Sequence, residues 1–173
     1  MNEPSMVVIS VDDAALRRIR SHAMQTYPEE CCGVLLGNDA DGGRREVIDI
    51  LEIRNARDDN RARRFLVTPE DYRYAEEQAR RRNVTLLGWY HSHPDHPAQP
   101  SAFDREHAMP WFSYIIVSVI GGTVDAVRSW RLLEDRSSYS EETVIESNHL
   151  SILPEERHGD KDSDPNTPEA LHQ

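Results

Sequence analysis

Hydrophobic and polar residues follow one another along this chain in blocks that predict a mixed α/β fold. Apolar runs of strand length alternate with polar segments and with stretches whose apolar side chains recur every three or four positions. The predicted strands cover residues 6–10, 31–37, 47–53, 65–67, 86–91, 114–120 and 124–133, with a further edge strand at 142–146. Gly- and Asp-rich turns follow the second and sixth strands, so we expect two hairpins.

Three helices are predicted, mainly from the signals at their N-termini. They run from residue 12 to Pro28, from residue 69 to about 82, and from residue 102 to about 108. Thr68–Asp71 and Ser101–Asp104 each match a capping box, in which a hydroxyl and an acidic side chain three residues later satisfy each other's backbone N–H groups. Prolines at 94, 97 and 100 predict that residues 91–100 form an irregular, fixed loop.

The length of 173 residues fits a single domain with a tail. We expect the domain to span residues 1–150 and residues 151–173 to form a polar, acidic and disordered tail. The only cysteines, Cys31 and Cys32, are adjacent, which excludes a disulfide framework. Buried packing is the expected role of both, because no residue pattern supplies a histidine partner for a cysteine nucleophile.

The charge of the chain narrows the choice of partners. Lys and Arg number 20 against 31 Asp and Glu, for a net charge of −11, which disfavours binding to nucleic acid or to an anionic membrane surface. The longest apolar stretches, such as Ile115–Ile120, are far shorter than the roughly 20 residues of a membrane span. The first residues lack the pattern of a secretory signal, so we expect a cytoplasmic protein.

Two histidines at the end of one predicted strand are the first candidates for chemistry. His91 and His93 lie two residues apart, so in an extended backbone both imidazoles point to the same side. The proline-rich connection can return the chain so that Asp104, in the first turn of the next helix, faces them. Two histidines and a carboxylate would leave zinc an open fourth position, the arrangement of a catalytic site.

Glu30 and Ser101 are candidates for the remaining catalytic roles. Glu30 precedes a buried strand that a sheet could lay beside the His91 strand, and it could act as the general base. Ser101 could donate a hydrogen bond to a developing oxyanion. Each assignment has an ordinary structural alternative: the histidines can be incidental, Ser101 and Asp104 can be only cap partners, and Glu30 can be a solvated acid.

Taken together, these residues resemble a known signature. Glu30-Cys31-Cys32-Gly33, His91-Ser92-His93-Pro94 and Ser101-Ala102-Phe103-Asp104 are similar to the pattern of the JAMM (MPN+) zinc metalloprotease family. That pattern is a Glu, then H-S/T-H-P, then S-x-x-D, and Ser101 stands at the expected seventh position after Pro94. The resemblance covers about residues 6–147.

The resemblance implies a cytidine deaminase-like MPN fold, with a curved mixed β-sheet flanked by helices. It implies one zinc ion on His91, His93 and Asp104, with Glu30 as general base and Ser101 as the oxyanion-stabilising hydroxyl. The family hydrolyses amide or isopeptide bonds at the C-termini of ubiquitin-like proteins. The short chain is most similar to the stand-alone prokaryotic branch, which implies a ThiS- or MoaD-like sulfur-carrier protein with a diglycine tail as substrate.

Other interpretations remain open at this point. A noncatalytic MPN-type module that binds a partner would be expected to lose metal ligands, and none is lost here. A zinc deaminase acting on small molecules lacks the second Cys-x-x-Cys half of its signature. His96 lies near the candidate ligands, but we expect it to be exposed. The Arg54–Arg64 loop is either a solvated segment or a contact for an acidic carrier protein.

Overall fold

The capping signals in the sequence place the helices close to where they are predicted. A computed structural model describes residues 7–40, 44–53 and 67–148 of the chain. The helices are α1 (Asp13–Thr26), α2 (Pro69–Arg81) and α3 (Ala102–His107). The side chain of Asp12 accepts hydrogen bonds from the first turn of α1, and both predicted capping boxes are formed, at Thr68 and at Ser101. All three helices are confirmed to within two residues at each end.

Seven strands are present in the described residues. They are β1 (Val8–Asp12), β2 (Cys32–Ala40), β3 (Arg44–Ile53), β4 (Thr85–Pro94), β5 (Ser113–Ile120), β6 (Thr123–Leu132) and β7 (Tyr139–Ser147). Both predicted hairpins are confirmed, because β2 pairs antiparallel with β3 and β5 with β6. The strand predicted at 65–67 is not supported, since Val67 belongs to no strand and residues 65–66 lie outside the described residues.

The mixed α/β class is confirmed, but the strands form a closed barrel and not the predicted curved sheet. Their order is β1-β3-β2-β4-β5-β6-β7, and β1 pairs in parallel with both β3 and β7. Consequently the strand predicted at 142–146 is not an edge strand. Closure relies on backbone hydrogen bonds such as that from Thr143 N to Val7 O, at 2.9 Å, and such bonds cannot be recognised in the hydrophobic pattern. Bulges in β3, β4 and β6 supply curvature.

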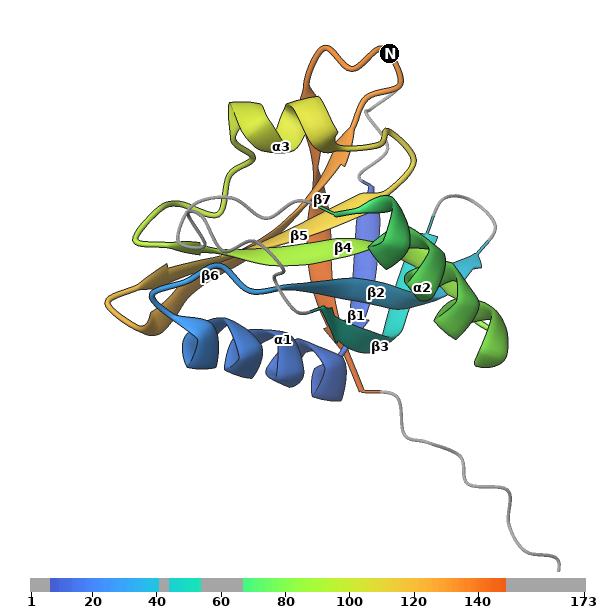
Figure 1. Cartoon of the computed structure of the whole chain (residues 1–173), viewed down its shortest axis with the longest axis horizontal. Helices are drawn as coiled ribbons and strands as arrows, with labels where there is room; N and C mark the ends of the chain where they lie inside the picture. The colour runs from blue at the N-terminus through green and yellow to red at the C-terminus, as the bar shows by residue number, and fades with distance from the viewer. Residues whose placement is uncertain (1–6, 41–43, 54–66, 149–173) are drawn as a thin grey trace, which may run out of the picture.

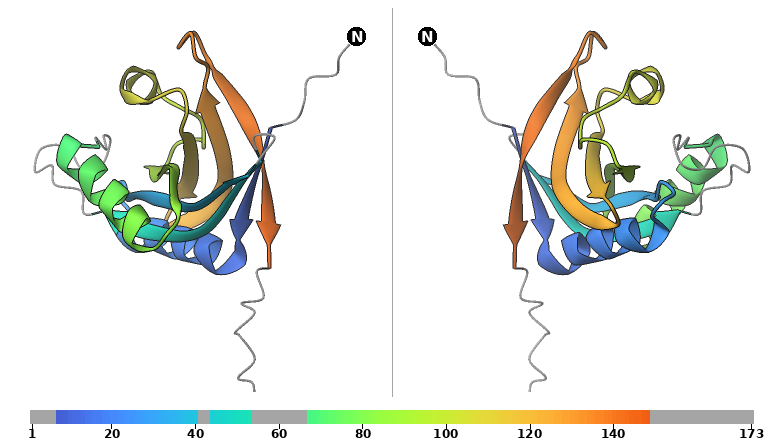
Figure 2. Two further views of the ribbon diagram at one scale, coloured as in Figure 1. Left: turned by 90° about the vertical axis from the view of Figure 1, so that its right-hand side faces the viewer. Right: turned by 90° about the vertical axis from the view of Figure 1, so that its left-hand side faces the viewer.

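Two apolar clusters hold the barrel and its helices together. One cluster joins Leu16 and Ile19 of α1 to side chains of β1 to β5. The other packs Ala75 and Ala79 of α2 against Trp89 and its neighbours on the opposite face of the sheet. Figures 1 and 2 show α3 on the other side of the molecule from α1, beside the hairpin of β6 and β7.

Strand β4 is longer than the sequence predicts, and this bears on the site. It continues to Pro94, paired in parallel with β5 as far as Val119, so residues 92–94 are not loop. Pro94 is tolerated because it stands at the strand's last position, where a missing N–H costs little.

The Arg54–Arg64 loop and the tail at 151–173 lie outside the described residues. Within the described ranges, no helix has the length and apolar character needed to cross a membrane.

Candidate metal centre

The candidate centre is built on the outer face of β4. His91 and His93 alternate with Ser92 along this strand, so both imidazoles lie on one side of the sheet. Ser92 points the other way and fastens β4 to the segment before β2: its Oγ accepts from Cys31 N at 2.8 Å, and its N donates to Cys31 O at 3.1 Å. The two histidines therefore start from a fixed backbone.

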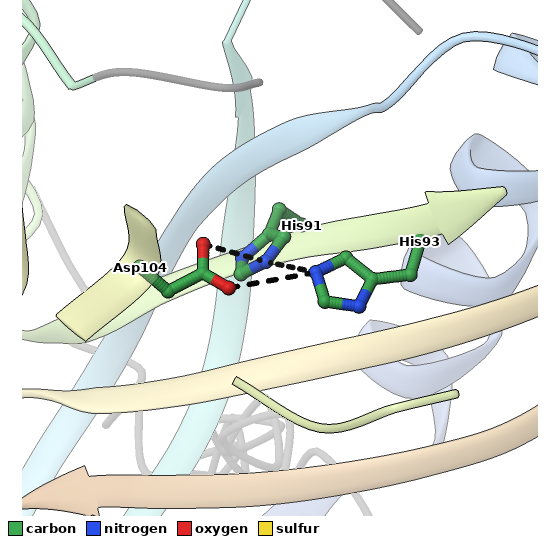
Figure 3. A group of neighbouring side chains, drawn as sticks. All are labelled: His91, His93 and Asp104. Carbon is green, nitrogen blue, oxygen red and sulfur yellow. Dashed lines mark hydrogen bonds and ion pairs between the residues drawn. The ribbon is translucent and has the colours of Figure 1, made fainter. Parts of the chain in front are cut away.

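Three side chains converge in Figure 3. His91 Nε2 lies 3.0 Å from His93 Nε2 and 3.4 Å from Asp104 Oδ1, and His93 Nε2 lies 3.6 Å from Asp104 Oδ2. Ligands about 2.05 Å from a tetrahedral zinc ion would stand about 3.3 Å apart. The two nitrogens are near that separation, and each nitrogen is near it from a different oxygen of the Asp104 carboxylate. Only 9, 12 and 17% of these side chains is exposed, in the same order. The group could hold a metal ion, as the sequence predicts.

A hydrogen bond sets the proton of His93 in the position that a metal ligand requires. Nδ1 of His93 lies 2.9 Å from the carbonyl oxygen of Pro97. A carbonyl can only accept, so Nδ1 carries the proton and Nε2 directs its lone pair toward His91 and Asp104. Histidines that bind metals are usually oriented by such a partner. Pro97 could not be identified in this role from the sequence, because a backbone carbonyl belongs to every residue and forms no motif.

The capping box of α3 orients the carboxylate of Asp104. Ser101 N donates to Asp104 Oδ2 at 2.6 Å, and Asp104 N donates to Ser101 Oγ at 3.1 Å. The cap interpretation of these two residues is therefore correct, and it is compatible with the ligand interpretation, because both carboxylate oxygens still face the histidines. The exposed Ser101 also forms a hydrogen bond to the Asp104 carboxylate through its side chain.

Electrostatics within the group favour opposite charges on its members. Burial alone would lower the pKa of His91, but attraction to Asp104, a hydrogen bond with it and a smaller effect of Glu30 raise the pKa above its ordinary value. Burial alone would raise the pKa of Asp104, but attraction to His91 and hydrogen bonds from His91, His93 and Ser101 lower it strongly. Asp104 is thus an anion, the form that binds a cation.

Glu30 is brought to this centre by the pairing of β2 with β4. Cys32 lies opposite His91 in that pairing, and Glu30 stands just ahead of β2. Its side chain is buried, with 6% of the residue exposed, so it is not the solvated acid of the structural alternative. The pairing of β2 with β4 therefore brings Glu30 near His91, and α3 brings Ser101 and Asp104 to the two histidines. His96, by contrast, is exposed and is not part of the metal-binding group.

An apolar pocket of about 120 Å³ adjoins the centre. His91 and Asp104 form part of its wall, and aromatic rings form much of the rest, namely those of Trp89, Phe103, Tyr114 and Tyr139. Cys32 lines the pocket, whereas Cys31 packs inside the barrel, as strand alternation predicts. Burial raises the pKa of Cys31 to about 11 and that of Cys32 well above its ordinary value, so both are thiols and not nucleophiles.

Comparison with known proteins places this site in a family. The family model described as prokaryotic homologues of the JAB domain matches residues 12–133. The chain is 34% identical to the desampylase of Haloferax volcanii over 110 residues, covering 63% of this chain and 76% of that protein. It is 31% identical to a probable TtuB-protein conjugate cleaving protease of Thermus thermophilus over 128 residues, covering 74% and 78%.

A phage protein and two solved structures are also similar. The chain is 33% identical over 97 residues to the tail tip assembly protein K of Escherichia phage N15, matching 54% of this chain but only 35% of the phage protein. A solution structure from Desulfitobacterium hafniense has a TM-score of 0.72 at 29% identity, covering 83% of this chain and 96% of that one. Another, from Salinibacter ruber, has a TM-score of 0.64 at 41% identity, covering 82% and 93%.

The family match takes in every candidate residue from Glu30 to Asp104 and most of the barrel. The chain therefore belongs to the family of prokaryotic homologues of the JAB domain, the prokaryotic branch of the JAMM/MPN+ proteins.

Proposed function

We propose that this chain is a zinc-dependent peptidase or isopeptidase that hydrolyses an amide bond at the C-terminal tail of a ubiquitin-like or sulfur-carrier protein. The observation that carries the proposal is the spacing of His91, His93 and Asp104, which matches that of tetrahedral zinc ligands. The names of the desampylase and of the conjugate cleaving protease support hydrolysis of bonds to ubiquitin-like proteins.

Activation of the attacking water and transfer of its proton are assigned to different groups of the site. When bound, zinc lowers the pKa of a coordinated water to about 7 and polarises the scissile carbonyl. Glu30, buried next to the ligands, accepts the proton of the attacking water. As the new C–O bond forms and the C–N bond breaks, Glu30 returns this proton to the leaving amine. A carboxylate that alternates between base and acid in this way needs no second proton carrier.

We assign Ser101 and the apolar pocket to binding of the substrate on either side of the scissile bond. The hydroxyl oxygen of Ser101 is occupied as the cap of α3, and its proton, which faces the Asp104 carboxylate, would turn to the oxyanion that develops on the scissile carbonyl. The aromatic pocket beside His91 and Asp104 has room for a side chain of the substrate near the scissile bond. We assign a diglycine tail to the carrier, because residues without side chains pass a narrow site most easily.

The metal content of the purified protein is the first test. We expect about one zinc per chain in the wild type and its loss in His93→Ala, with circular dichroism showing that both proteins are folded. A chelator should abolish cleavage of a carrier conjugate, and added zinc should restore it. A folded wild type that takes up no zinc would contradict the proposal and favour the noncatalytic binding module.

The role of Glu30 is tested by a matched pair of variants. Glu30→Gln removes the base and keeps the shape of the side chain, whereas Glu29→Gln makes the same change at an exposed neighbour. We expect Glu30→Gln to lower kcat by about 100-fold or more while zinc content is unchanged, and Glu29→Gln to retain activity. Suitable substrates are a diglycine-ending carrier joined to a lysine side chain and the same carrier extended by a cysteine. Undiminished cleavage of both by Glu30→Gln would exclude Glu30 as the base.

A further inference from the structure

The helix that carries Asp104 has little to hold it in place by itself. Helix α3 has six residues, and none of them is buried. So short a helix is unstable alone, since its nucleation cost is repaid only over a longer run of hydrogen bonds. Its position, and with it that of the Asp104 carboxylate, must depend on what binds its two ends. The capping box accounts for the N-terminal end only.

Arg136 holds the other end. Its Nη1 donates to the carbonyl oxygen of Ala108 at 2.9 Å, and its Nη2 donates to those of Glu106 at 3.2 Å and Arg105 at 3.3 Å. These carbonyls are among the last of the helix, which have no partner within it. The guanidinium also places a positive charge at the negative end of the helix dipole. One side chain therefore satisfies three acceptors with a single fork of donors.

The contact between Arg136 and Ala108 is connected to the proposed ligand Asp104 by one backbone hydrogen bond. Ala108, whose carbonyl accepts from Arg136, donates its own N–H to the carbonyl oxygen of Asp104 at 2.8 Å. A shift of Ala108 would thus be passed to the backbone of Asp104, one hydrogen bond away. The side chain of Asp104 in turn lies 3.4 and 3.6 Å from the two imidazoles. Small movements of α3 would alter those separations first.

The turn between β6 and β7 is shaped to present Arg136. Arg136 has φ of 60°, a left-handed conformation that residues other than glycine seldom adopt. The turn is closed by Arg136 N to Leu133 O at 2.8 Å and by Leu133 N to Ser138 O at 3.0 Å. Figure 2 shows the tip of this hairpin next to α3. Glycine adopts this backbone conformation more easily than arginine, so the presence of Arg136 here indicates that its side chain has a structural role.

We propose that Arg136 is a positioning residue of the metal centre, which clamps the C-terminal end of α3 and so fixes the Asp104 carboxylate relative to His91 and His93. The inference rests on the proposed function, because it takes the three side chains to be metal ligands. It adds a residue 32 positions beyond Asp104, on a hairpin outside the signature.

The test uses Arg136→Gly, with Arg128→Ala as control. Glycine suits the left-handed turn and removes the whole side chain with its guanidinium, whereas Arg128 lies on β6 of the same hairpin, where it pairs with Glu141. Zinc affinity by chelator competition, the visible spectrum of the cobalt-loaded protein, and amide hydrogen exchange of residues 102–108 in metal-free protein are measured in each variant. We expect Arg136→Gly to weaken zinc binding about tenfold, change the cobalt spectrum and speed exchange at Ala108, while Arg128→Ala matches the wild type.

Two results would overturn the clamp. One is wild-type exchange at Ala108 together with wild-type zinc affinity in Arg136→Gly. The other is an equal loss of zinc affinity in Arg128→Ala, which would show a general effect of weakening the hairpin. If the proposed function is wrong, the wild type itself would bind neither zinc nor cobalt. Amide hydrogen exchange at Ala108 in the metal-free protein would still show whether Arg136 holds α3 in place.

Discussion

Trp130 donates its indole N–H to the carbonyl oxygen of Ala98 at 3.0 Å, which ties β6 to the loop that follows the two candidate histidine ligands. The neighbouring carbonyl, that of Pro97, is the one that orients His93. On the other side, Ser118 Oγ donates to the carbonyl of His96 at 2.7 Å. The carbonyl that sets the His93 ring is therefore held between two anchored neighbours.

Trp130→Phe should loosen this loop and weaken metal binding. The substitution keeps an aromatic ring and removes one hydrogen bond, worth about 1 kcal/mol, which corresponds to about a fivefold loss of zinc affinity. Chelator competition measures the change. Trp111→Phe is the control, because Trp111 is 62% exposed and lies in the segment before β5. Equal zinc affinity in all three proteins would show that the loop is fixed without Trp130.

Ser101→Ala and Thr68→Ala together separate capping from catalysis. Both hydroxyls cap a helix through the same capping box, so each substitution should lower the free energy of unfolding by about 1 kcal/mol. Only Ser101 adjoins the metal group, so only Ser101→Ala should lower kcat, by about 100-fold at saturating zinc. Urea denaturation and cleavage assays measure the two effects. If both variants retain full kcat, Ser101 acts only as a cap.

Glu142 should be essential to the stability of the barrel. It is 1% exposed, accepts hydrogen bonds from Ser113 Oγ and Ser129 Oγ, and lies 2.6 Å from Nη2 of Arg131. Glu142→Gln would leave positive charge uncompensated inside the barrel, where Arg45 also donates to Ser113. We expect unfolding free energy to fall by about 2 kcal/mol, with Arg131 one-quarter exposed and partly screened.

Urea denaturation tests this with Glu141→Gln as the matched control. Glu141 is the exposed neighbour of Glu142 on β7, and its side chain is 51% exposed where it pairs with Arg128. Its neutralisation should change stability by less than about 0.5 kcal/mol. Equal effects of the two variants would show that the buried network contributes nothing beyond surface charge.

His22 should make the stability of the protein depend on pH. Burial lowers the pKa of His22 below its ordinary value of 6.5, with a smaller opposite effect of Glu52, and its Nδ1 lies 2.9 Å from Tyr90 Oη. The unfolded chain therefore binds a proton more readily than the folded protein. The contribution of His22 to the free energy of unfolding should be fully present above pH 6.5. It should decline as the pH falls from 6.5 through the lower pKa of His22 in the folded state.

His22→Gln tests this, since glutamine can accept a hydrogen bond from Tyr90 but does not titrate. Urea denaturation over the acidic range should show a shallower decline of unfolding free energy in His22→Gln than in the wild type. His107→Gln, which replaces an exposed histidine of α3, should leave the slope unchanged. Identical slopes in the wild type and His22→Gln would show that other groups dominate.

The candidate site could be found from the sequence because its parts are local. His91 and His93 face one way on any strand, and Ser101 and Asp104 meet in any capping box. The same holds for the caps of α1 and α2, which depend on side chains a few positions apart. Such signals do not depend on the rest of the chain, so the helices and the two hairpins were predicted correctly, and the three candidate metal ligands lie together as expected.

Only the tertiary structure decided the features that join distant segments. The pairing of β1 with β7 closes the barrel through backbone groups, and the carbonyls of Pro97 and Ala108 reach their partners in the same way. Every residue has such backbone groups, so their use leaves no pattern in the sequence. Arg136 likewise looks like any exposed arginine until the fold brings it to α3. The sequence by itself determined which side chains could bind a metal, and the three-dimensional packing decided what holds them in place.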